Sequence, residues 1–119
     1  MEEFKFIARL MFAIYMFIAA YNNTTGFGPT VAMMRGLKLP VPSLILPLVI
    51  VFEIVAPIAL FIPSVATYAA ILLAIFCVVA PSIAHAFWTM PDNFERFLHK
   101  NLFFANITIA TGFLMLSAS

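Results

Sequence analysis

Long apolar stretches separated by polar links dominate the pattern of this chain. Four of them, residues 4–21, 44–62, 65–89 and 101–116, approach or exceed the roughly 20 residues with which a helix crosses a bilayer core of about 30 Å. Together they make up most of the chain. The pattern predicts an all-α fold, a transmembrane four-helix bundle that makes one integral membrane domain over residues 1–119.

The links between these stretches differ in length. Pro63 and Ser64 make a tight hairpin between the second and third stretches, and the other two links are long. The first link holds an apolar piece, TVAMM, among glycines and prolines, which predicts a short interfacial or re-entrant helix. The last link spaces Phe94, Phe97 and Leu98 between charged residues, a pattern typical of amphipathic turns at the membrane surface. With one crossing per span, both long links emerge on the same side.

Composition strengthens the membrane prediction. Hydrophobic residues make up 65% of the chain and charged residues 9%, against about 45 to 50% and about 25% in soluble domains. A net charge of +1 provides no basic stripe for a phosphate backbone, so we expect membrane lipids and not nucleic acid as contacts. The first stretch resembles a secretory signal, but Arg9 interrupts it and no small-residue cleavage site follows Ala20. We therefore expect it to stay as a span.

The sequence holds no catalytic motif and no metal-binding motif. A single cysteine, Cys77, excludes a disulfide within the chain and leaves too few thiolates for a structural metal site. His85 and His99 are fourteen residues apart on different predicted elements. A haem between them would need facing helices at matched depth, and nothing else in the sequence supports one. We expect no catalytic residues, no metal and no covalently bound cofactor.

Glu53 is the most informative residue, because it places a carboxyl group near the middle of the second span. Intramembrane acids are costly in hydrocarbon and are functional by default. Pro57 lies four residues later and cannot donate to the backbone carbonyl of Glu53. The carboxyl group and the backbone carbonyl of Glu53 should therefore both face protein, water or a ligand. Two kinds of role are open for Glu53. It binds a ligand or handles protons, or it has a structural role in which its carboxyl group only joins two helices.

Further polar and aromatic residues lie between Glu53 and the long links. Helical rise places them near the link-side ends of the first, third and fourth spans. Together with Glu53 they predict a ligand-binding pocket open to the long links, although Trp88 also suits an anchor at the membrane interface. The five residues are Tyr15, His85, Trp88, Asn101 and Asn106.

Several short motifs resemble one family. The third span ends in AHAFW, FLHKN opens the last span, and FE follows GLKLPVPS in the second. From about residue 36 to residue 112 the chain is similar to the DoxX-like group of small four-helix membrane proteins. The resemblance implies a prokaryotic cytoplasmic membrane and an association with quinone-linked or thiol redox systems. It points to Glu53, His85, Trp88, Lys100 and Asn101 as motif residues. Ala56 and Pro57 stand where relatives commonly have glycine.

Three functional hypotheses follow. The preferred one is an accessory subunit of a membrane redox complex, not catalytic alone, whose pocket holds a quinone or lipid headgroup through a protonated Glu53. The second is a free-standing, self-associating binding or transport protein for a small hydrophobic substrate. The third is a purely structural subunit among other integral membrane subunits. Four basic residues near the long links against two near the N-terminus favour cytoplasmic long links.

Overall fold

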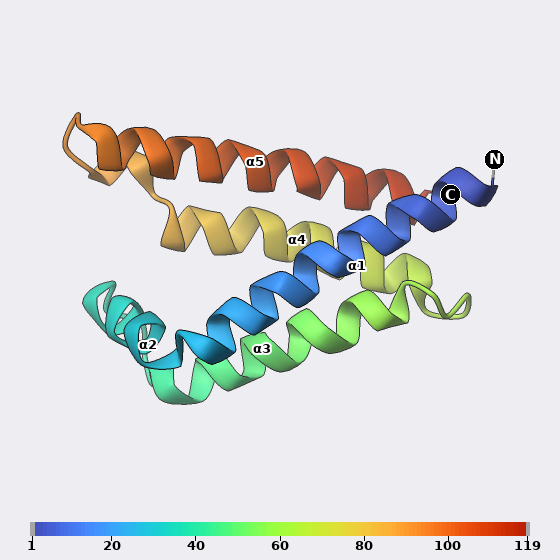
Figure 1. Ribbon diagram of the computed structural model, residues 1–119, viewed down its shortest axis with the longest axis horizontal. Helices are drawn as coiled ribbons and strands as arrows, with labels where there is room; N and C mark the ends of the chain where they lie inside the picture. Colours follow the sequence, from blue (N-terminus) through green and yellow to red (C-terminus); the bar gives the residue numbers. More distant parts are fainter. Residues whose placement is uncertain (1, 119) are drawn as a thin grey trace. The chain divides into compact units, whose positions relative to one another are not determined.

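The computed structural model describes residues 2–118, and within that range all regular secondary structure is helical, with no strand. The helices are α1 (Glu2–Thr25), α2 (Phe27–Gly36), α3 (Pro42–Ala59), α4 (Ala66–Ala84) and α5 (Phe94–Ser117), with a 3₁₀ turn η1 (Phe87–Thr89) before α5 (Figure 1). The described chain divides into two compact units, with the boundary between Ala69 and Ala70. The predicted all-α class is confirmed. A single domain stays a prediction.

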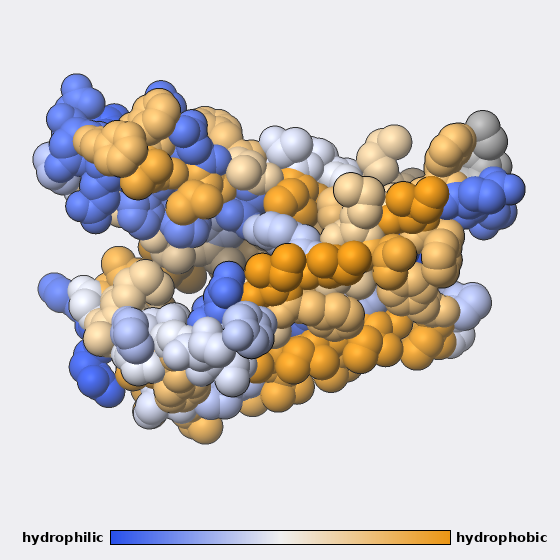
Figure 2. All heavy atoms as spheres, in the orientation of Figure 1, coloured by the Kyte–Doolittle hydropathy of each residue, from blue (hydrophilic) through white to orange (hydrophobic). Residues whose placement is uncertain are grey.

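Three helical stretches are long and apolar enough to cross a membrane: α1, α3, and residues 66–89, which join α4 to η1. The fourth predicted span lies within α5, whose 24 residues extend about 36 Å at 1.5 Å per residue. Figure 2 shows hydrophobic residues along the exposed lengths of α1 and α3, whereas hydrophilic residues gather on the first turns of α5. Helices of this composition suit a lipid environment, because each satisfies its backbone hydrogen bonds internally.

Helix α1 continues four residues beyond the predicted end of the first span at Tyr21. The hydroxyl groups of Thr24 and Thr25 donate to the carbonyls of Ala20 and Tyr21, one turn back, so these polar residues fit within the helix. Gly26 then separates α1 from α2. A Cβ atom there would lie 3.1 Å from the carbonyl oxygen of Asn22, which explains why glycine suits this tight junction.

The short helix predicted after the first span is α2, and it packs on α3. Val31 and Met34 of α2 form a buried cluster with Leu46 of α3, which is 2% exposed. Half-buried residues surround this cluster: Phe27, Leu39, Ile45, Val49 and Ile50. The link between the two helices contains Lys38 and Val41 in left-handed conformations, with φ of 61° and 39°. Pro42 follows at the first position of α3, where its missing N–H is not needed.

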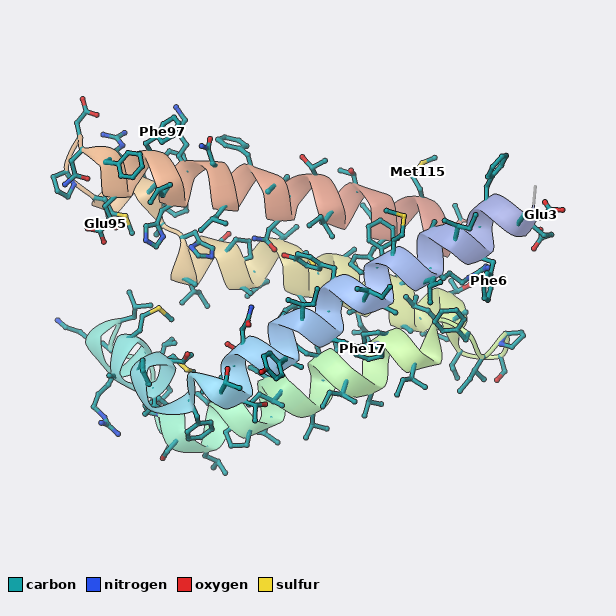
Figure 3. All side chains as sticks on the ribbon, in the orientation of Figure 1. Glu3, Phe6, Phe17, Glu95, Phe97 and Met115 are labelled. Atoms are coloured by element: carbon teal, nitrogen blue, oxygen red, sulfur yellow. The ribbon has the colours of Figure 1, made fainter. Side chains whose placement is uncertain are left out.

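The second unit is a helical hairpin whose boundaries differ from the prediction. Residues 94–100, predicted as separate amphipathic turns at the surface, form the start of α5 and continue without a break into the last span. Asn93 caps this helix, because its side-chain oxygen accepts a hydrogen bond from the Arg96 backbone N–H at 3.1 Å. No proline interrupts residues 94–117, so the helix propagates from this cap. Glu95 and Phe97 extend from its first turns to different sides (Figure 3).

Candidate functional site

The carboxyl group of Glu53, a residue of the first unit, is buried. Its residue is 3% exposed and lies eleven residues after Pro42, about 16 Å along the axis of α3. Its Oε1 atom accepts a hydrogen bond from Nδ2 of Asn23 at 2.8 Å. A buried carboxyl group requires such partners, because an unpaired polar group in an apolar setting is strongly destabilising. Within the first unit, the Asn23 amide supplies such a partner.

Asn23 is a site residue that the sequence analysis did not select. It is half-buried in the last turns of α1, whereas its neighbour Asn22 is exposed. The extension of α1 past Tyr21 carries the Asn23 amide to the level of Glu53. The two residues are thirty positions apart, and no local pattern links them. The signal in the sequence that could have identified Asn23 was the pair of amide side chains, Asn22 and Asn23, directly after an apolar span.

Pro57 lies inside α3 and is fully buried, as the spacing from Glu53 predicts. Because proline has no N–H, it cannot donate to the Glu53 backbone carbonyl in the usual helical hydrogen bond. Glu53 thus brings two acceptor groups, a carboxyl and a backbone carbonyl, to one level of α3. Tyr15 lies on α1 eight residues before Asn23, so the two side chains share one side of that helix.

In the second unit, His85 and His99 are in direct contact. His85 follows the end of α4, and its Nδ1 lies 2.9 Å from Nδ1 of His99 in the second turn of α5. The ring centroids are 5.0 Å apart and the ring planes are tilted by 44°. Such a hydrogen bond requires an N–H on one ring and a lone pair on the other. The contact leaves no room for a porphyrin between the rings, so these residues do not form a bis-histidine haem site in this arrangement.

An aromatic cluster holds η1 against α5 next to the histidines. Trp88 meets Phe103 edge to face, with centroids 5.4 Å apart, and Phe87 meets the same ring at 5.6 Å. The Nζ atom of Lys100 lies 5.8 Å from the centroid of Phe87, within cation–π range. Trp88 is still 53% exposed, a position that suits both an interface anchor and a contact surface.

The two asparagines of α5 differ in their surroundings. Asn101 is exposed, two residues after His99. Asn106 is half-buried, and its Nδ2 donates to the backbone carbonyl of Leu102, one turn back in the same helix, at 2.9 Å. Part of the hydrogen-bonding capacity of Asn106 is therefore used within α5.

The predicted residues divide between the two units. Glu53 and Tyr15 belong to the first, and the second contains His85, Trp88, Asn101 and Asn106. Glu53 is paired with Asn23 and His85 with His99. One shared pocket formed by all six residues stays a prediction.

Comparison with known proteins adds a family assignment. The sequence pattern of the DoxX family matches residues 4–86, a segment that includes Glu53 and His85 and ends before Trp88. The chain is 28% identical over 111 residues to the inner membrane protein YqjF of Escherichia coli strain K12, covering 93% of this chain and 79% of that protein. No solved structure matches the chain.

Proposed function

Because this chain belongs to the DoxX family, we propose that it is a membrane subunit that supports a quinone-linked redox complex and holds a quinone or lipid headgroup at Glu53. The chain is a multi-pass integral membrane protein, and its E. coli relative is named as an inner membrane protein. The subunit is not catalytic alone: we assign it no catalytic residue. Its partners in this proposal are membrane lipids and other integral subunits.

The observation that carries this proposal is the buried carboxyl group of Glu53. Among residues 2–118, one hydrogen bond reaches this carboxyl, from the Asn23 amide to Oε1. A protonated carboxyl whose first oxygen is held in this way can offer its second oxygen as an O–H donor to a carbonyl. Carbonyl groups are the polar features of a quinone ring and of an ester-linked lipid headgroup. Pro57 leaves the Glu53 backbone carbonyl without its helical donor, so this carbonyl supplies an acceptor for a hydroxyl group of the bound molecule.

The outer faces of α1 and α3 support the subunit part of the proposal. Large apolar side chains are exposed along α3 at Leu44, Leu48, Val51, Val55 and Ile58. Such faces suit contact with acyl chains or with the helices of other integral subunits, since both surroundings are apolar. Tyr15, which belongs to the same unit as Glu53, would line the approach to it.

A structural role is the second candidate, and the same hydrogen bond favours it. The Asn23–Glu53 contact joins α1 to α3, and a polar contact between helices can serve only to hold them together. This candidate predicts a folded subunit that assembles with partners but carries no bound organic molecule.

Retention of the ligand on purification tests the proposal. The chain is purified from its native membrane in mild detergent, and quinones and lipids are extracted and quantified per chain. We expect Glu53→Leu, which has no hydrogen-bond donor, to retain at least about fivefold less headgroup-bound molecule than the wild type, since one buried hydrogen bond is worth about 1 to 3 kcal/mol. Glu53→Gln should retain the molecule, because its amide N–H replaces the carboxyl O–H. Thermal unfolding of Glu53→Gln should stay close to that of the wild type, because Gln keeps the acceptor for Asn23.

Glu95→Leu is the matched control. It removes the same functional group from an exposed position on α5 and should retain the ligand like the wild type. Equal retention in the Glu53→Leu variant would exclude ligand binding at Glu53 and leave the structural role. Co-purification of redox subunits with the wild type tests the proposed partners separately. If no redox subunit co-purifies from native membranes, the proposed association with a redox complex is contradicted.

A further inference from the structure

We propose that His85 and His99 form a binding site for a divalent transition metal, Cu²⁺ foremost, at the junction of α4 and α5. Neutral imidazole is a ligand that suits copper, nickel and zinc. The two Nδ1 atoms face each other at 2.9 Å, one from the residue that follows α4 and the other from α5. This site goes beyond the proposed function, and it does not depend on a ligand at Glu53.

The separation of the nitrogens matches a particular coordination angle. A metal at about 2.05 Å from each Nδ1, the usual distance to imidazole, would see the two atoms at about 90° when they are 2.9 Å apart. Neighbouring ligands subtend this angle in the square-planar or tetragonal sites of Cu²⁺ and Ni²⁺. Tetrahedral Zn²⁺ would require the atoms to separate to about 3.3 Å. Because 2.9 Å is also an ordinary hydrogen-bond distance, the preference for copper rests on the Irving–Williams order, in which Cu²⁺ binds nitrogen ligands more tightly than Ni²⁺ or Zn²⁺.

The surrounding structure holds both rings close to this arrangement. The backbone N–H of His85 donates to the Pro81 carbonyl at 2.8 Å, which continues the helical pattern of α4 to this residue. On the other side, the Asn93 cap fixes the start of α5 six residues before His99. The contacts of Phe87 and Trp88 with Phe103 hold the intervening turn against α5. Pre-ordered ligands lose less conformational entropy when the metal binds.

Binding changes the tautomer of one ring and leaves the number of protons unchanged. In the hydrogen-bonded pair, one ring carries its proton on Nδ1 and the other on Nε2. A metal that takes both Nδ1 lone pairs requires the first ring to move its proton to Nε2 through water. Binding fails when either ring is doubly protonated, because that ring then has no lone pair.

The site has two protein ligands. Within residues 2–118, no group of three His, Cys, Asp or Glu side chains is arranged to hold a metal, so water would fill the remaining positions. The prediction from sequence that no metal site exists rested on the lack of cysteines and on the fourteen-residue separation of the histidines. The contact between the rings changes that inference, and these two residues are the only histidines of the chain.

Copper titration of the full chain in phosphatidylcholine nanodiscs tests the proposal. We expect one equivalent of Cu²⁺ to bind the wild type and to show electron paramagnetic resonance couplings from two imidazole nitrogens. His85→Gln and His99→Gln should each bind at least about tenfold more weakly, a loss of at least about 1.4 kcal/mol. Cys77→Ala, which removes the buried thiol, should bind like the wild type.

Two results would overturn the metal site. One is equal affinity for Cu²⁺ in the wild type and in a variant with both histidines replaced. The other is a wild-type spectrum without coupling to two imidazole nitrogens, which decides the question even where a histidine variant fails to fold. Loss of binding in Cys77→Ala would assign the metal to the thiol and would equally contradict the proposal.

Discussion

The buried Glu53 shows how one residue constrains its surroundings. A carboxyl group at this position of an apolar helix needs a donor, and the donor comes from Asn23 at the end of another helix. The sequence predicts the need, because the acid lies in the middle of an apolar stretch. It does not identify the donor, since the amide lies thirty residues away. The histidine pair shows the same limit over fourteen residues.

A double-mutant cycle measures the Asn23–Glu53 contact. We expect Asn23→Ala and Glu53→Leu to be coupled by about 0.6 to 1.7 kcal/mol, from the average to the maximum measured for polar contacts between membrane helices. Of the two single substitutions, Asn23→Ala should destabilise the protein more, because it leaves the buried carboxyl without its donor. The free energy of unfolding in mixed micelles checks this prediction.

Asn22→Ala is the control for this cycle, because Asn22 is adjacent but exposed. Its coupling to Glu53→Leu should be close to zero. If Asn23 shows no more coupling than Asn22, the hydrogen bond contributes nothing to stability.

At the scale of elements, the apolar pattern predicts the helices better than their ends. Residues 4–21 lie within α1, and 101–116 lie within α5, but both helices extend into residues that the polar pattern assigns to links. Back-bonding threonines extend α1, and an asparagine cap starts α5 early. The helices extend past their apolar stretches because apolar length decides where a helix can span, whereas local hydrogen bonds decide where it ends.

The packing of α2 on α3 gives a prediction for this scale. Leu46→Ala should destabilise the first unit by about 2 to 5 kcal/mol, because it opens a cavity between Val31 and Met34. Leu48→Ala, two residues later and 64% exposed, should change stability by less than about 0.5 kcal/mol. Thermal unfolding compares the two variants.

Limited proteolysis gives a second measurement of the same packing. Release of α2 should speed trypsin cleavage at Arg35 and Lys38 in Leu46→Ala and leave it unchanged in Leu48→Ala. Equal cleavage in the two variants would show that the buried cluster does not hold α2 in place.

For the whole molecule, family membership and composition agree on a multi-pass membrane protein. The number of crossings remains the main prediction from sequence. Three helical stretches satisfy the length and composition of a span, and α5 has the length together with charged first turns. Four crossings require both long links to lie on one side of the membrane.

Labelling of single cysteines tests this topology in a Cys77→Ala background. We expect Lys38→Cys and Asp92→Cys to react from the same side of sealed vesicles, and Ser64→Cys from the other, since all three positions are exposed. The balance of basic residues predicts that the first two face the cytoplasm. Opposite labelling of Lys38→Cys and Asp92→Cys would mean that α3 and residues 66–89 do not both cross the membrane.

The sequence by itself determined the class of this protein, the number and approximate positions of its long helices, and the residue most in need of a partner. These properties follow from apolar length and from hydrogen bonds within each helix, and both are local along the chain. Only the tertiary structure decided that Asn23 meets Glu53 and that His85 meets His99. Those contacts depend on how helices are placed beside one another, and no local period encodes that placement.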